Sequence, residues 1–236
     1  ATGAMQAFNL EAEDLTLVAD GITGVLVSSK FSAEDYAGAL AQAGAIAGST
    51  GVSLQDFNAV IGSTASSFAS GSDAGTSFKT FLQRMANPTD EAKALMQQLG
   101  ISVFDSSGNM KDMSQIVGQL NKSFGGMTEQ QKANTAAVLG GADASRTLLA
   151  LAGMTSEEFN ALSAQINASG QATQAAATRV DSLSGAWEIL NGIIQGIQIQ
   201  VGDLFLPTLR QVTSVLSDLA STNAPSTGCP FLSLTY

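Results

Sequence analysis

The feature that most constrains this chain is a periodic run of large apolar residues in its last third. Their spacings alternate between three and four positions without a break, in the order Val180, Leu183, Trp187, Leu190, Ile194, Ile197, Val201 and Leu204. We refer to these residues as the seam. On a helix of 3.6 residues per turn, this spacing places all of them along one stripe. The seam therefore predicts a long helix whose apolar stripe is covered by another helix.

Glycines inside the predicted helix argue against it, and they stand at Gly185, Gly192, Gly196 and Gly202. Each glycine costs about 1 kcal/mol relative to alanine within a helix. Burial of one large apolar side chain contributes about 1.5–3 kcal/mol, so a covered seam outweighs the glycines. Gly192 and Gly196 also form a G-x-x-x-G on a second helix face, which predicts close helix packing. We therefore expect the seam to form an oligomer within a multi-helix bundle.

The chain up to residue 168 carries a repeated helix-start signal. At Ser32, a capping box is combined with a hydrophobic staple, in which Phe31 packs on Tyr36. Further starts are expected at Ser53, Asp112, Thr128 and Thr155. These signals and the apolar spacing predict helices near 10–28, 33–48, 54–69, 73–86, 90–99, 113–123, 129–139, 142–152 and 156–167. The predicted module is a bundle of short, capped helices.

One segment departs from the helical pattern. Between residues 101 and 111, β-branched and aromatic residues flank a Ser-Ser-Gly-Asn turn, which predicts one small β-hairpin. The predicted fold is thus all-α apart from this hairpin, with a compact helical module over 1–168. A long, coiled-coil-like heptad helix follows over 169–220, with a break near Pro207. Residues 221–236 are rich in Pro, Ser and Thr and are expected to be a disordered or non-native tail.

Composition excludes several classes of function. Twenty acidic and ten basic residues give a net charge of −10, and the basic residues are scattered, so direct nucleic-acid binding is not expected. The chain has no histidine, which removes the Ser-His and Cys-His arrangements and most catalytic zinc sites. The lone Cys229 allows no internal disulfide. We predict no enzymatic activity, no cofactor and no metal, and we find neither a signal peptide nor a membrane-spanning run.

Adjacent acidic residues are candidates for a site with two catalytic carboxylates. The pairs are Glu13/Asp14, Glu34/Asp35, Asp90/Glu91 and Glu157/Glu158. Three of them directly follow a Ser or Thr cap, where negative charge complements the helix dipole, so capping is the expected role. Asp105, Asn109 and Asp112 surround Gly108, but their spacing does not match a calcium loop. They predict a turn followed by a helix start.

Several motifs, in this order, resemble the tail tape measure proteins of tailed bacteriophages and prophages. The motifs are Ser32-Ala33-Glu34-Asp35, Gly51-Val52-Ser53, Gly71-Ser72-Asp73-Ala74-Gly75-Thr76, Phe81-Leu82-Gln83-Arg84-Met85-Ala86-Asn87-Pro88, Asp105-Ser106-Ser107-Gly108-Asn109-Met110-Lys111-Asp112 and Gly202-Asp203-Leu204-Phe205-Leu206-Pro207. They extend over most of the chain up to about residue 219. The chain resembles the core region of the family, without its long upstream helical part, and is expected to be a fragment.

The resemblance implies a structural virion protein. Such proteins lie in several copies in the lumen of the assembling tail tube, set tail length, and leave ahead of the DNA at genome ejection. The implied partners are further copies of the chain, tail tube and tail tip proteins, and tail assembly chaperones, with host cytoplasm as the place of assembly. An alternative remains open, in which the bundle inserts into the host membrane as a pore or ejection channel. Its neutral face around Gly192 permits that interpretation.

Overall fold

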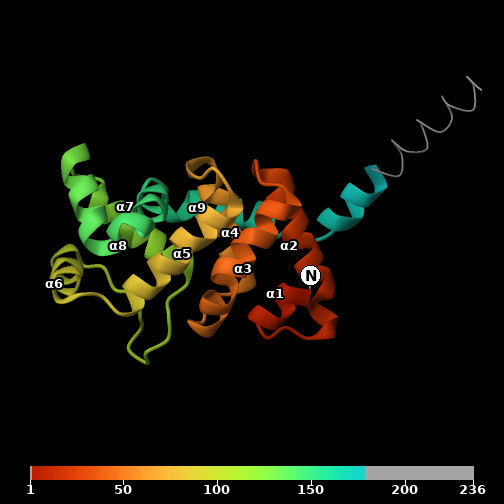
Figure 1. The fold of residues 1–236 in the computed structure, drawn as a ribbon, viewed down its shortest axis with the longest axis horizontal. Helices are drawn as coiled ribbons and strands as arrows, with labels where there is room; N and C mark the ends of the chain where they lie inside the picture. Colours follow the sequence, from red (N-terminus) through yellow and green to blue (C-terminus); the bar gives the residue numbers. More distant parts are fainter. Residues whose placement is uncertain (1, 179–236) are drawn as a thin grey trace, which may run out of the picture. The chain divides into compact units, whose positions relative to one another are not determined.

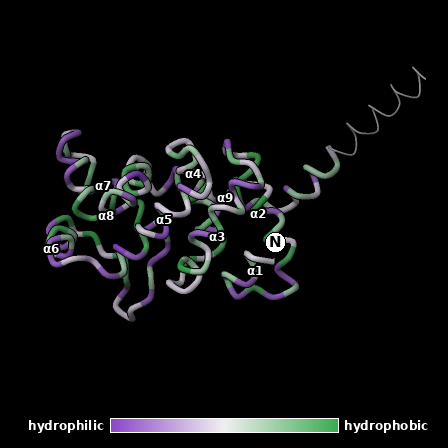
Figure 2. The backbone as a smooth tube through the Cα atoms, viewed as in Figure 1, coloured by the Kyte–Doolittle hydropathy of each residue, from purple (hydrophilic) through white to green (hydrophobic). Residues whose placement is uncertain are grey.

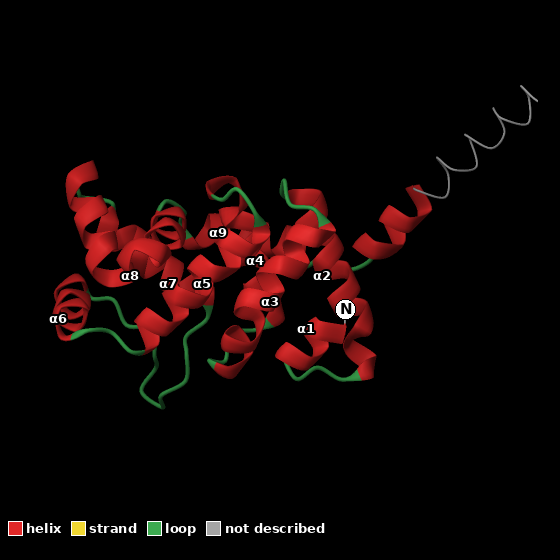
Figure 3. Ribbon diagram, in the orientation of Figure 1, coloured by secondary structure: helices red, strands yellow, loops and turns green. Residues whose placement is uncertain are grey.

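The computed structural model of the protein describes residues 2–178, which form helices joined by loops (Figures 1 and 3). The elements are α1 (Thr2–Ala7), η1 (Ala12–Asp14), α2 (Leu15–Ser28), α3 (Ala33–Ser49), α4 (Leu54–Thr64), η2 (Ala65–Ser67), α5 (Gly71–Ala86), α6 (Asp90–Leu99), α7 (Met113–Phe124), α8 (Glu129–Ala152) and α9 (Ser156–Ile166). A further helical run occupies residues 171–178. The described residues contain no strand, so the prediction of an all-α fold is confirmed for them.

The helices belong to one compact unit, residues 1–177. Within this unit, Figure 1 shows α6 at one end and α1 with the N-terminus at the other. The centre holds a chain of aromatic rings from α3, α4 and α5. The Phe57 ring lies 6.2 Å from that of Tyr36 and 6.1 Å from that of Phe78, which in turn stacks 6.1 Å from Phe81. All four rings are buried, so this contact holds the three helices together.

Most predicted helix starts are confirmed because their caps are local. At Ser32 the hydroxyl accepts from the Asp35 backbone N–H at 3.1 Å, and the Asp35 carboxylate accepts from the Ser32 N–H at 3.0 Å. Thr128 and Thr155 form the same reciprocal box at the starts of α8 and α9. Phe31 and Tyr36 are both buried beside the first box, as a staple requires.

Two predicted starts use their side chains differently. Ser53 accepts from the Asp56 N–H at 3.0 Å, but the Asp56 carboxylate instead accepts from the Met113 N–H at 3.4 Å. Asp112 makes no side-chain cap hydrogen bond. Asp56 of α4 therefore satisfies the first N–H of α7, a contact between elements that the local pattern did not predict.

Helix boundaries also differ from the prediction at the ends of three segments. The expected helix 10–28 is the turn η1 followed by α2, and α1 was not predicted. Helix α5 begins at Gly71 and not at 73, because Ser70 caps it by accepting from the Asp73 N–H at 3.2 Å. Helix α4 ends at Thr64 and passes into η2, after which extended backbone carries the buried Phe68.

The predicted break between residues 139 and 142 is confirmed as a kink. Helix α8 runs through both segments, but Gly141 has a non-helical backbone with φ 67° and ψ −171°. This left-handed φ is one that glycine adopts at little cost. The second half then packs on α5, where the Ser77 hydroxyl donates to the Asp143 carbonyl at 2.6 Å and accepts from Thr147 at 2.8 Å.

The segment predicted as a β-hairpin is a turn with a single antiparallel bridge, between Phe104 and Met110. The Asp105 carboxylate accepts from the N–H groups of Ser107 at 2.8 Å and Asn109 at 2.9 Å, which confirms the turn interpretation of these residues. The chain leaves α6 at Gly100 and enters α7 at Met113. Two backbone hydrogen bonds join the arms of the turn, from the Asp105 N–H to the Asn109 carbonyl and from the Lys111 N–H to the Val103 carbonyl, each at 2.9 Å, and the pairing extends no further into strands.

Asp35 is expected to make stability depend on pH in the acidic range. Its carboxylate accepts from the Gly71 N–H at 2.9 Å, and this bond, with those from the Ser32 backbone and side chain, lowers the pKa of Asp35 below its ordinary value of 3.8. The stabilisation is present above the unfolded-state pKa and is lost as pH falls through the lowered folded-state pKa. Asp35→Asn should therefore reduce the free energy of unfolding by about 1–2 kcal/mol at pH 7, since the amide offers one acceptor oxygen.

Urea unfolding of both proteins between pH 7 and pH 2.5 measures this difference, which should shrink below about pH 4. The matched control is Glu34→Gln, which removes a neighbouring, exposed charge from the same helix turn. A constant difference across this pH range would contradict the role given to Asp35.

Candidate functional site at the start of the last described helix

The residues predicted to form the oligomer seam lie outside the described residues. This applies to Val180, Leu183, Trp187, Leu190, Ile194, Ile197, Val201 and Leu204, to the close-packing pair Gly192 and Gly196, and to the predicted break and tail. The described chain ends two residues before the seam, within the helical run 171–178. That run is therefore the described element nearest to the seam in sequence.

Asp20 of α2 holds the start of this run. Its side chain is 4% exposed, and its two carboxylate oxygens accept from the N–H groups of Gly170 and Ala172, each at 2.8 Å. The first turn of a helix has N–H groups without intrahelical partners and a partial positive charge, so a carboxylate suits this position. The Gln174 N–H donates to the Gly170 carbonyl at 2.9 Å, which is the first hydrogen bond of the new helix.

Two glycines of α2 bring the surrounding backbone close to Asp20. A Cβ atom at Gly24 would lie 1.7 Å from the carbonyl oxygen of Ile166, at the end of α9. A Cβ atom at Gly21 would lie 2.3 Å from the Asn58 side-chain nitrogen and 3.3 Å from the Asn167 side-chain oxygen. At Gly24 only glycine permits the approach, so α2 contacts the end of α9 through backbone, and Gly21 leaves space for the Asn58 and Asn167 side chains.

A row of polar side chains, buried at Tyr36 and Asn58 and half-buried at Asn167, completes the junction. The Tyr36 hydroxyl donates to the Asn58 oxygen at 2.7 Å, and the Asn58 nitrogen donates to the Asn167 oxygen at 3.2 Å. Asn167 ends α9 and donates to the carbonyls of Ser163 at 2.9 Å and Gln55 at 3.2 Å. Burial raises the pKa of Tyr36 well above its ordinary value, so its hydroxyl stays protonated and remains a donor.

We name this arrangement the helix anchor and define it as Asp20, Gly21, Gly24, Asn58, Asn167 and Gly170. Side chains from α2, α3 and α4 thereby fix the end of α9 and the start of the next helix. The hydrogen-bonding groups of the helix anchor are paired with one another and with backbone groups. We therefore assign the anchor a structural role and not a chemical one. It holds the start of the helical run 171–178 against α2.

The adjacent carboxylates predicted as caps lie apart in the structure and at helix starts. Glu34/Asp35, Asp90/Glu91 and Glu157/Glu158 occupy the first turns of α3, α6 and α9. Asp14 of the fourth pair accepts from the Glu11 N–H at 3.1 Å, at the start of η1. Residues 2–178 hold no group of three or more side chains able to ligate a metal. Within the same range, no helix has both the length and the apolarity needed to cross a membrane.

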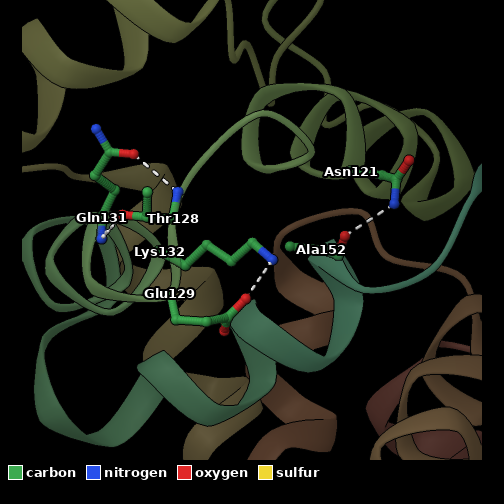
Figure 4. Close-up of polar contacts among 6 residues, drawn as sticks. All are labelled: Asn121, Thr128, Glu129, Gln131, Lys132 and Ala152. Atoms are coloured by element: carbon green, nitrogen blue, oxygen red, sulfur yellow. Dashed lines mark hydrogen bonds and ion pairs between the residues drawn. The ribbon is translucent and has the colours of Figure 1, made fainter.

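A second polar cluster, drawn in Figure 4, lies beside a groove between α7 and α8. Asn121 donates to the Ala152 carbonyl at 3.0 Å, and Lys132 pairs with Glu129 at 2.9 Å beside the capping box of Thr128 (Figure 4). The groove has a volume of about 390 Å³ and also borders Phe124 and Leu149. The ion pair between Lys132 and Glu129 joins two residues of the same helix turn. Because the Glu129 side chain is nearly fully exposed, the pair contributes little to stability.

The sequence did not identify the helix anchor, although one signal for it was visible. Asp20 is the single charged residue between Asp14 and Lys30, within an otherwise uncharged helix. Such a residue is either exposed or paired when buried. Its partners lie 150 positions away, so no local pattern could name them.

This fold defines a structural helical module, in which capped helices surround one core and a buried carboxylate holds the start of a further helix. Residues 1–141 match the family of phage-related minor tail proteins, and the chain belongs to that family. It is similar to the tape measure protein of Pneumococcus phage Dp-1, with 29% identity over 214 residues that cover 90% of this chain and 19% of that protein.

A second relative is the probable tape measure protein of Escherichia phage P2. Its identity is 23% over 215 residues, covering 89% of this chain and 26% of that protein. The chain thus spans about a fifth to a quarter of the length of these curated relatives. No solved structure matches the chain. The resemblance to tape measure proteins drawn from the sequence motifs is confirmed.

Replacing the anchoring carboxylate should loosen the helix start. Asp20→Ala leaves the N–H groups of Gly170 and Ala172 without acceptors, at about 1–3 kcal/mol each. We expect the free energy of unfolding to fall by about 2–4 kcal/mol, with faster amide hydrogen exchange at residues 170–174. Asp73→Ala, which removes an exposed carboxylate from the first turn of α5, should change stability by at most about 1 kcal/mol and leave that exchange unchanged. Unaltered exchange in Asp20→Ala would show that another contact holds the helix start.

Gly24→Ala tests the close approach of α2 and α9. The added methyl would meet the Ile166 carbonyl oxygen, so we expect a loss of about 3 kcal/mol in urea unfolding. The control is Gly126→Ala, where a Cβ atom would meet no atom within 4 Å. Equal stability of the two variants would contradict the backbone contact.

Proposed function

We propose that this chain is part of a phage tape measure protein that sets tail length, occupies the lumen of the tail tube, and leaves ahead of DNA at ejection. The support is its membership of the minor tail protein family and its similarity to two proteins named as tape measure proteins. In this proposal it is a virion component that acts through helix packing, without a catalytic group.

The proposal divides the chain into two parts with different roles. A ruler needs long unbroken helices, since a helix advances about 1.5 Å per residue. Helix α8 is the longest helix within residues 2–178, with 24 residues, and it is kinked at Gly141. We therefore assign residues 1–168 to a compact module that contacts the tube or tip, and the seam beyond it to self-association.

The helix anchor is the observation that carries this assignment. A module that served only as a spacer would not need to fix the outgoing helix with a buried carboxylate, two glycines and an asparagine pair. The anchor makes the module and the start of the helix move together, so assembly of the seams would place the modules in defined positions. Further copies, tube and tip proteins, and tail assembly chaperones are the proposed partners, and the net charge of −10 does not favour contact with DNA phosphates.

Deleting Val180–Leu204 should abolish self-association, because it removes every large apolar side chain of the seam. Light scattering on the purified protein should then give the mass of a single copy. The control deletes residues 221–236, which lie outside the seam, and should leave the copy number unchanged. A seam deletion that keeps the original copy number would contradict the proposal.

Vesicle leakage separates this function from the membrane-inserting alternative. A structural module should leave vesicles intact, whereas a pore-forming bundle would release an enclosed dye. Leakage caused by the full chain, and lost on deletion of the seam, would favour the alternative.

A further inference from the structure

The break between α9 and the helical run 171–178 is short and has only a weak local cause. It consists of Ala168, Ser169 and Gly170, which follow the C-cap of α9. None of the three is proline, and Gly170 alone has a left-handed backbone, with φ 85°. A glycine is disfavoured about fivefold relative to alanine within a helix, and α2 continues through two of them. Contacts from outside the segment must therefore maintain the break.

Helix α2 holds apart the two groups that would close this break. In a continuous helix, the Gly170 N–H would donate to the Ile166 carbonyl, four positions earlier. In the structure that N–H donates to the Asp20 carboxylate at 2.8 Å. The Ile166 carbonyl oxygen lies against Gly24, 1.7 Å from where a Cβ atom would stand. Asp20 and Gly24 are one turn apart, so a single face of α2 occupies both partners of the missing helix bond.

The same carboxylate takes a second N–H group of the new helix. The Ala172 N–H donates to Asp20 at 2.8 Å, whereas in a continuous helix it would donate to the Ala168 carbonyl. Asp20 is the single charged residue of α2, and Figure 2 shows most of that helix in the green of hydrophobic residues. If α2 moved away, both N–H groups would need other acceptors. The carbonyls of Ile166 and Ala168 are placed in the sequence to supply them.

Helix α4 holds the end of α9 without disturbing its helical backbone. The Asn167 side chain donates to the Gln55 carbonyl and accepts from the Asn58 side chain, each at 3.2 Å. The Asn167 N–H still donates to the Ser163 carbonyl at 2.9 Å, as in a helix. Joining α9 to the helical run therefore requires new backbone torsions mainly at residues 168–170.

We propose that α2 is a clamp that keeps α9 and the helical run 171–178 apart, and that the two join into one helix over residues 156–178 when α2 moves away. The joined helix would be about 34 Å long, against about 16 Å for α9 alone. Hydrogen bonds are conserved, because the N–H groups released by Asp20 gain carbonyl acceptors within the helix. The two states thus differ mainly in how α2 packs on the end of α9, which is a hinge confined to a few residues.

The clamp goes beyond the proposed function and does not depend on self-association, because it concerns residues 2–178 alone. In a tape measure protein it would give a compact module the means to lengthen one helix without unfolding the rest of its core.

Hydrogen exchange in two variants tests the clamp. Asp20→Ala frees the N–H groups of Gly170 and Ala172, and adding Gly170→Ala removes the residue that tolerates a left-handed backbone. A Cβ atom at Gly170 would meet no atom within 4 Å, so the methyl group fits. In the double variant we expect exchange at residues 170 and 172 to slow at least about fivefold relative to Asp20→Ala, because alanine favours the helix by about that factor. The Cα chemical shifts of Ala168 and Ser169 should move to helical values at the same time.

The matched control is Gly108→Ala in the same Asp20→Ala background. Gly108 has φ 84° and, like Gly170, no atom within 4 Å of an added Cβ, but it lies in the turn between α6 and α7. This control carries the same left-handed penalty and should leave exchange and chemical shifts at residues 168–172 unchanged.

Gly170→Ala alone keeps the proposal testable if Asp20→Ala does not fold. With α2 unchanged, the alanine should still move the Cα shifts of Ala168 and Ser169 toward helical values, and Gly108→Ala alone should not. The clamp is overturned if exchange in the double variant stays as fast as in Asp20→Ala, or if these shifts stay non-helical in both Gly170→Ala variants. The seam deletion tests the proposed function separately, so failure of one leaves the other standing.

Discussion

The structure depends on one buried carboxylate placed at the start of a helix. Asp20 has exchanged water for two backbone N–H groups, and the helix dipole supplies the partial positive charge that makes this exchange tolerable. The contact joins residues 20 and 170, and so ties the early helices to the last described one. A helix start that is held in position needs a contact that is both strong and directional. A charge-assisted hydrogen bond pair has both properties.

Small residues make that contact reachable. The chain contains 24 glycines and only 13% charged residues, so its helices approach through backbone more than through long side chains. A Cβ atom at Gly71 would lie 1.8 Å from the Asp35 carbonyl oxygen, and the Asp35 carboxylate accepts from the Gly71 N–H. The same solution recurs at Gly24 beside Ile166. In both places, close backbone packing brings a carboxylate of one helix to the first N–H group of another.

The sequence by itself determined the local features. The caps at Ser32, Thr128 and Thr155 and the break at Gly141 depend on residues a few positions apart, so pattern and propensity were enough to place them. Tertiary structure decided that the Asp56 carboxylate accepts a hydrogen bond from the Met113 N–H, and what Asp20 binds. Those outcomes depend on which helix ends meet in space, and the Asp20 partners are 150 residues away. An amphipathic pattern shows which face of a helix is buried, but the identity of the partner follows only when the whole core is packed.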